Sequence, residues 1–70
     1  MTKALRIQLG KNLKKARLKA GMTQEEVAIK AKIHPNYFAR IERGEANPSQ
    51  EKLFGIAKAL KVNSSKILPY

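Results

Sequence analysis

Residues 23–44 read TQEEVAIKAKIHPNYFARIERG, and the first half of this stretch has the pattern of a short, well-capped helix. Thr23 is a favourable N-cap, and Glu26 follows three residues later, which is the pattern of a capping box. Helical spacing then places Val27, Ala28 and Ala31 on one apolar side. A helix is therefore predicted from Gln24 to Lys30 or Ala31.

The second half of the stretch predicts another short helix after a tight break. A proline keeps the residue before it out of the helical region, so the break falls at His34, and Pro35 suits the first helical position. Phe38 and Ile41 then lie on the buried side of a helix predicted from Pro35 to Arg43, which Gly44 ends. Two short helices joined by a tight turn are the outline of a helix-turn-helix.

The flanking sequence predicts three more helices and no strand, because no segment alternates between apolar and polar residues over a strand's length. A first helix is expected from about Leu9 to Lys19, with Gly10 at its start and residues 1–8 as a flexible basic arm. Another should follow the cap Ser49, with Leu53, Ile56, Ala57 and Leu60 in the core. A last short helix is expected from Asn63 or Ser64 through Leu68. Residues 1–70 are thus predicted to form one compact all-α domain of five helices.

The charge balance predicts a polyanionic partner. Lys and Arg number 15 against 5 Asp and Glu, a formal net charge of +10. Residues 1–44 hold 11 basic and 3 acidic side chains, net +8, whereas residues 45–70 hold 4 and 2, net +2. The chain has no cysteine, no apolar run long enough for a membrane span and no signal-peptide pattern, so we expect a cytoplasmic protein without a membrane partner.

Few residues suit catalysis or metal binding. His34 is the only histidine, and no second histidine, cysteine or carboxylate stands at metal-ligand spacing from it. The segment LGKN at residues 9–12 lacks the frame of a phosphate-binding loop. We therefore expect no enzyme activity, no metal and no cofactor.

Three segments together resemble one known family. They are ARLKAGMTQEEVA at residues 16–28, YFARIERGEANPS at residues 37–49 and LFGIAKALKV at residues 53–62. In order and spacing they resemble the Cro and phage-repressor type (XRE-like) helix-turn-helix family, over about Leu9 to Leu68. The resemblance implies a lambda-repressor-like fold and a sequence-specific regulator, usually a dimeric repressor or activator on a palindromic operator, whose third helix enters the major groove of double-stranded DNA.

The third helix supplies the base-reading candidates. If Phe38 and Ile41 face the core, Asn36 and Arg40 lie one turn apart on the other side. Asparagine pairs with adenine and arginine with guanine in the major groove. Pro35 stands at a position that often reads a base and could offer only an apolar contact, for example with a thymine methyl. For Tyr37, a DNA contact and packing at the domain edge remain equal alternatives.

Other residues are expected to contact phosphates or to support the reading helix. In the family, the residue at the Gln24 position bonds a phosphate and those at the Arg17 and Glu42 positions form a partly buried ion pair. The remaining phosphate candidates are Thr23, Lys14, Lys32 and Arg43.

Two positions depart from the family pattern. Lys32 stands where the family commonly has glycine, so the backbone there either avoids positive φ or carries strain of about 1 kcal/mol. His34 replaces the usual Ser or Thr cap.

The C-terminal end is more apolar than the edge of a basic domain requires. We expect residues 62–70 to be a dimerisation end, with an interface formed by Phe54, Ile67, Leu68 and Tyr70. Two alternative functions remain: a protein-interaction module on the same fold, such as an antitoxin or coactivator bridge, and a nucleic-acid or anionic-membrane binder that acts through charge alone. Repression or activation, the operator and any protein partner are not distinguished by the sequence.

Overall fold

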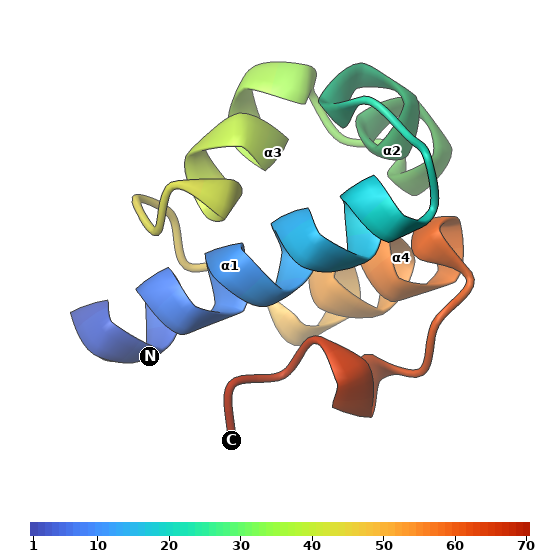
Figure 1. The fold of residues 1–70 in the computed structure, drawn as a ribbon. Helices are drawn as coiled ribbons and strands as arrows, with labels where there is room; N and C mark the ends of the chain where they lie inside the picture. The colour runs from blue at the N-terminus through green and yellow to red at the C-terminus, as the bar shows by residue number, and fades with distance from the viewer.

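A computed structural model describes all 70 residues as four α-helices and one 3-10 turn, in the arrangement of Figure 1. The elements are α1 (Lys3–Lys19), α2 (Gln24–Ala31), α3 (Pro35–Glu42), α4 (Gln50–Leu60) and η1 (Ser64–Lys66). The all-α prediction is confirmed. The predicted fifth helix is only the single turn η1, because its last residues pack into the core instead of continuing a helix.

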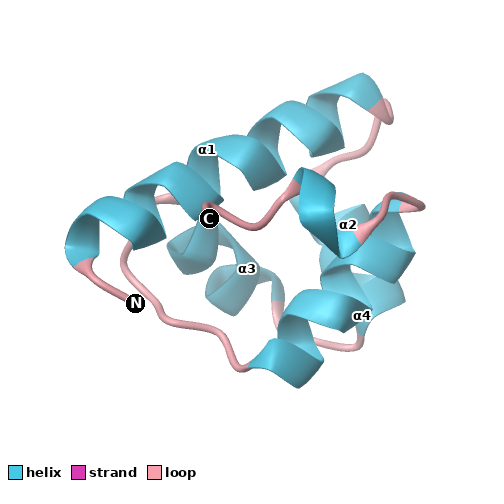
Figure 2. Ribbon diagram, turned by 90° about the horizontal axis from the view of Figure 1, so that it is seen from below, coloured by secondary structure: helices cyan, strands magenta, loops and turns pink.

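The helices enclose one small core. α2 packs against α4, α1 packs against α3, and α2 and α3 contact each other, as two perpendicular views show (Figures 1 and 2). Phe38 and Ile41 of α3 are fully buried, as their helical spacing predicts, together with Leu9 and Leu13 of α1. The α4 residues predicted to be buried also lie in the core: Leu53, Ile56, Ala57 and Leu60.

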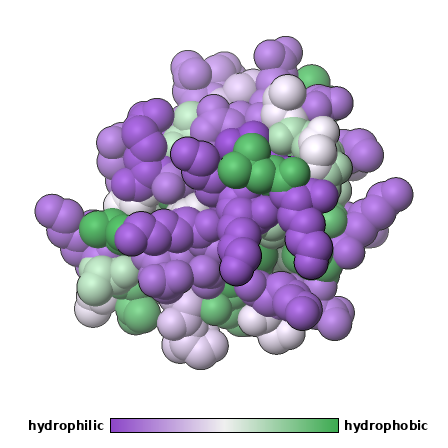
Figure 3. Space-filling model, viewed as in Figure 1, coloured by the Kyte–Doolittle hydropathy of each residue, from purple (hydrophilic) through white to green (hydrophobic).

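The outer surface is mostly polar. On the face seen in Figure 3, hydrophilic side chains dominate and the apolar areas are small and separated. No helix combines the length and the apolar character that crossing a membrane requires.

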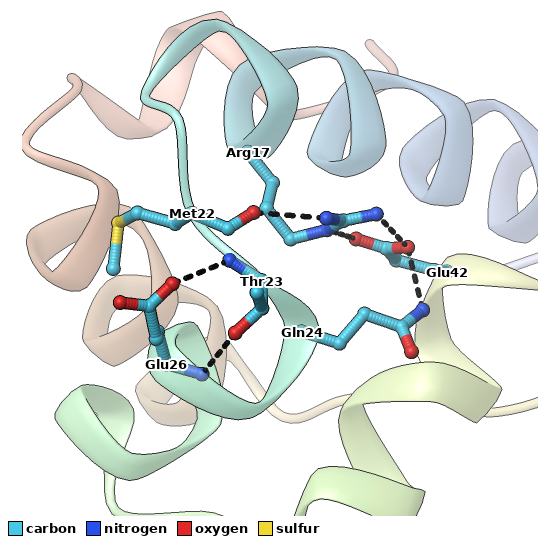
Figure 4. A network of polar contacts seen from close by, with 6 residues as sticks. All are labelled: Arg17, Met22, Thr23, Gln24, Glu26 and Glu42. Atoms are coloured by element: carbon cyan, nitrogen blue, oxygen red, sulfur yellow. Dashed lines mark hydrogen bonds and ion pairs between the residues drawn. The ribbon is translucent and has the colours of Figure 1, made fainter.

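Local capping explains where α2 and α3 begin. Thr23 Oγ1 accepts a hydrogen bond from Glu26 N, and Glu26 Oε1 accepts one from Thr23 N at 2.8 Å, so the predicted capping box is present (Figure 4). Hydrogen bonding to the Glu26 carboxyl, first from the Thr23 backbone N–H and then from the Thr23 side chain, lowers the pKa of this carboxyl. At α3, His34 Nδ1 accepts from Asn36 N at 3.0 Å, so His34 does cap the helix.

The predictions for the N-terminal end are wrong. Thr2 caps α1 by accepting from Leu5 N at 3.2 Å, so residues 3–8 belong to this helix instead of forming the predicted arm. Arg6 fixes this turn further, because its Nε donates to the Gly44 carbonyl at 3.3 Å. Gly10 does not start the helix but lies in its middle, buried against α3.

Gly10 is required by the close approach of α1 to α3. A Cβ atom at this position would stand 2.8 Å from the carbonyl carbon of Glu42 and 2.9 Å from the carbonyl oxygen of Ile41, and it would overlap the Glu42 carbonyl oxygen. These are backbone atoms, which cannot move aside as a flexible side chain does. The crossing of α1 and α3 therefore depends on the missing side chain.

A polar network joins three helices at the end of α3 (Figure 4). Arg17 of α1 donates from Nε to Glu42 Oε2 at 2.7 Å and from Nη1 to the Met22 carbonyl at 2.9 Å. Gln24 of α2 donates to Glu42 Oε1 at 2.9 Å. The Glu42 side chain is only 3% exposed, so this charge is withdrawn from water and matched by Arg17.

Two lysines adopt a left-handed backbone conformation. Lys32 (φ 60°) follows α2 and Lys61 (φ 58°) follows α4, and each is the C-cap of its helix. Of the two alternatives for Lys32, the structure shows positive φ, with the strain of about 1 kcal/mol that this conformation carries in a residue with a Cβ atom.

The C-terminal segment is partly a core element. Ile67 is fully buried, and its carbonyl accepts a hydrogen bond from Asn12 Nδ2 of α1 at 3.0 Å. The prediction that Ile67 belongs to a dimer interface is therefore wrong, because the side chain is already covered within one chain.

We predict different effects for alanine at two helical glycines. Gly10→Ala should lower the free energy of unfolding by about 1–3 kcal/mol, because the new Cβ forces α1 and α3 apart. Gly55→Ala in α4 is the matched control, because its nearest contact is the Ala31 carbonyl oxygen at an ordinary 3.7 Å. It should be neutral or stabilising by up to about 1 kcal/mol, the helix-propensity gain. Urea unfolding of both variants measures the change. A Gly10→Ala protein as stable as the parent chain would contradict the close approach of α1 and α3.

Candidate nucleic-acid interface

The exposed side of α3 carries the predicted base-reading residues. Asn36 and Arg40 are exposed and lie one turn apart, while Phe38 and Ile41 hold the opposite side in the core. Pro35 is half-buried at the first turn of the same helix. The two polar side chains thus stand on a helix that is fixed from behind.

A shallow hollow brings the starts of α2 and α3 together. Its lining includes Thr23, Gln24, Pro35 and Asn36, four of the residues predicted to contact DNA. Exposed backbone N–H groups in the first turn of a helix attract anions. The hollow therefore brings the predicted phosphate-contacting residues of α2 close to the predicted base-reading residues of α3.

Gln24 has a structural partner as well. One N–H of its side-chain amide donates to Glu42, which leaves the second N–H free for another acceptor. The bond to Glu42 holds the amide at the rim of the hollow, so a phosphate would meet a side chain that is already oriented.

Arg43 is paired with a residue that the sequence analysis did not consider. Arg43 Nε and Nη2 donate to the two carboxylate oxygens of Glu45 at 3.0 and 3.2 Å, with both side chains more than half exposed. The hydrogen bond from Arg43 lowers the pKa of the Glu45 carboxyl, and the same bond raises the pKa of Arg43. Both groups are therefore charged at neutral pH. The only signal in the sequence was their spacing of two residues across Gly44.

Tyr37 lies at the domain edge. Its ring is half-buried against the core, and Lys52 Nζ stands 5.8 Å from the ring centroid. This position agrees with the packing role, one of the two alternatives weighed for the residue.

The two predicted phosphate-contacting lysines lie apart from the hollow. Lys14 is exposed on α1. Lys32 lines a different concave surface with residues of α4. The single histidine and the five glutamates of the chain form no group of three or more, as a metal site would require.

The remaining candidates for a dimer interface surround a second small hollow. Phe54 is 51% and Tyr70 80% exposed, and both line this hollow with the half-buried Leu68 and with Met1 at the other end of the chain. It lies where the start of α4 meets the two chain ends.

Comparison with known proteins agrees with this architecture. The chain is 35% identical over its full length to control protein C.BamHI of Bacillus amyloliquefaciens, covering 88% of that protein. It is 37% identical over 97% of its length to the transcriptional regulator ClgR of Mycobacterium tuberculosis, covering 61% of that protein. The crystal structure of the restriction-modification controller protein C.AhdI from Aeromonas hydrophila superposes with a TM-score of 0.90 at 26% identity, covering 93% of this chain and 98% of that one.

The family assignment follows from the extent of the match. A family model described as helix-turn-helix matches residues 13–67, which include α2, α3 and the turn between them. Together with the relatives above, this shows that the chain belongs to the XRE-type helix-turn-helix family of DNA-binding regulators.

Proposed function

We propose that this regulator binds a palindromic site in double-stranded DNA as a homodimer and that each protomer reads its half-site with α3. The observation that carries the proposal is the placement of Asn36 and Arg40 on the exposed side of a helix whose other side is fixed by Phe38 and Ile41. A rigid helix with an exposed polar side can enter the major groove without unfolding part of the domain.

Base reading follows from the chemistry of the two side chains. The Asn36 amide can pair with adenine N6 and N7, and the Arg40 guanidinium with guanine O6 and N7. Pro35 can add an apolar contact to a thymine methyl at the edge of the same surface. Tyr37 would contribute mainly by supporting α3 from the core side.

Phosphate contacts would fix the register of α3 on the duplex. Thr23 and Gln24 lie beside Asn36, so a DNA strand passing the start of α2 would meet them directly. Arg43 and Lys14 are exposed cations that could approach the backbone on either side. The net charge of +10 supports attraction to DNA before any specific contact forms.

The names of the relatives suggest the kind of regulation. C.BamHI is a control protein and C.AhdI a restriction-modification controller, whereas another relative of 37% identity is the immunity repressor of Bacillus phage phi105. We propose that this chain likewise controls transcription, as a repressor, from DNA in the bacterial cytoplasm. It would act by occupying an operator, with no catalytic step.

A dimer would place two α3 helices in successive major grooves. Half-sites then lie one helical turn apart, about 34 Å. The patch formed by Phe54, Leu68 and Tyr70 is the proposed contact, because it exposes aromatic surface at one end of the molecule. Selection of bound sites from random duplexes would test the proposal as a whole, and a symmetric consensus with this spacing is the expected result.

Alanine at Asn36 or Arg40 should weaken binding to the selected site by about 1–3 kcal/mol, with little loss on random DNA. Fluorescence anisotropy on both duplexes measures the difference. Lys66→Ala serves as a control that removes a charge from η1. Equal losses on specific and random DNA would contradict base reading by these two residues.

Glu45→Gln should strengthen binding to random DNA, because it frees Arg43 for a phosphate. The slope of log K against log salt concentration should steepen by about one unit, the value for one added phosphate contact. In an Arg43→Gln background, Glu45→Gln should leave the slope unchanged. Glu51→Gln is the matched control, since it removes an exposed carboxylate that forms no ion pair. The same gain in slope from both substitutions would contradict a specific restraint on Arg43.

Phe54→Lys should weaken dimerisation at least about tenfold, since it places a charge in the centre of the proposed interface. Sedimentation equilibrium without DNA measures this. Ile29→Lys is the control, because Ile29 is comparably exposed, at 66%, on α2. Truncation of the tail would be a poorer test, because it removes the core residue Ile67. An unchanged association constant in Phe54→Lys would place the interface elsewhere.

A further inference from the structure

Four lysines surround a concave surface that the DNA-reading helix does not form. We call this surface, lined by Lys30, Lys32, Lys58 and Lys61, the lysine cleft. Its hollow is about 440 Å³, and its floor consists of small residues, Ala31, Gly55 and Ala59. The lining comes from the C-terminal end of α2 and from the middle and C-terminal end of α4, and no α3 residue takes part.

None of the cleft lysines forms an ion pair within the chain, although Lys30 lies one helical turn after Glu26 and its charge acts on that carboxylate. All four lysines are exposed. No acidic side chain lines the hollow. Four ammonium groups gathered around one hollow repel one another, and an anion bound among them would remove that repulsion.

The backbone conformation of two cleft lysines is independent support for a ligand. The chain has four residues with positive φ: glycine occupies two of these positions, 21 and 44, and lysine occupies the two that border the cleft, 32 and 61. At Gly21, as at many helix ends, glycine removes the strain of this conformation. The last-turn lysines Lys30 and Lys58 suit the negative end of a helix dipole. The helix dipole therefore accounts for Lys30 and Lys58. It does not explain why the C-cap positions with positive φ are occupied by Lys32 and Lys61 and not by glycine.

We propose that the lysine cleft is a second anion site that binds a chain of two or more phosphates. Lysine binds phosphate as a point charge, without the planar geometry that arginine offers to carboxylates. Four such positive charges around one hollow exceed the negative charge of a single phosphate group. The floor of alanine and glycine offers no apolar pocket for a peptide side chain. The phosphates come either from a DNA strand outside the half-site read by α3 or from a free oligophosphate.

The test uses the double variant Lys32→Gly/Lys61→Gly and inorganic tripolyphosphate. Glycine relieves the strain at both positions, so the variant should unfold at a higher temperature than the parent chain. Its affinity for tripolyphosphate, measured by calorimetry against sulfate at matched ionic strength, should fall roughly tenfold. Because stability and binding change in opposite directions, loss of binding cannot result from unfolding.

The control variant Lys3→Gln/Lys11→Gln removes the same net charge from exposed positions of α1 outside the cleft. It should keep most of the tripolyphosphate affinity. The proposal would be overturned if both variants lost the same tripolyphosphate affinity, or if the parent chain bound tripolyphosphate no more tightly than sulfate.

A second arm identifies the source of the phosphates and relies on the proposed DNA binding. Duplexes carrying the selected site are compared with and without about ten flanking base pairs at each end. The cleft is assigned to DNA if the flanking base pairs raise the affinity for the duplex, if the glycine variant loses this increase, and if tripolyphosphate abolishes it by competition. Tripolyphosphate binding without a flank effect assigns it to a free oligophosphate. A failure of site selection would remove the proposed function but leave the tripolyphosphate arm intact.

Discussion

The carboxylate of Glu42 is the point on which the arrangement of the first three helices depends. It is almost completely withdrawn from water, so it requires a positive partner, and Arg17 supplies one at 2.7 Å. The second oxygen accepts from Gln24, so α1, α2 and α3 meet at a single group. Such a pair adds little net stability compared with apolar packing, but it fixes geometry, because each partner is strongly destabilised without the other. The orientation of α3 relative to the start of α2 is set here.

The same contact region explains why α3 can be short and still present a defined surface. Gly10 lets the backbone of α1 approach Ile41 and Glu42 directly, and Phe38 with Ile41 fills the space beneath the helix. An isolated helix of eight residues would be marginal in water. In this fold, tertiary contacts at the middle and at the end of α3 supply the stability that so short a helix lacks. The side chains of Asn36 and Arg40 are therefore not needed to hold the helix in place.

The sequence predicted the parts of the molecule that local interactions determine. The bounds of α2, the capping box at Thr23 and the buried side of α3 follow from neighbouring residues, and the structure has them. The errors concern residues whose role depends on distant partners. Gly10 was predicted to start a helix because its close contact with α3 is not visible in the sequence. Ile67 was predicted to lie in an interface because Asn12, which binds its carbonyl, is 55 residues away. The restraint of Arg43 by Glu45 was missed for a different reason: two exposed charges two residues apart are common and normally mean little.

The positive charge of this chain is therefore of three kinds. Arg6 and Arg17 are partly buried and bonded within the fold, Arg43 is exposed but held by a carboxylate, and Arg40 and the lysines are exposed and form no ion pair. Only the last kind attracts a polyanion at full strength, and its members are not concentrated on α3, which carries Arg40 alone besides the C-cap Arg43. If α3 reads DNA as proposed, its few cations limit the contribution of charge to affinity there, so that more of the discrimination comes from base contacts. Attraction that is independent of sequence would then be located on other surfaces, and the two strained lysines border one of them.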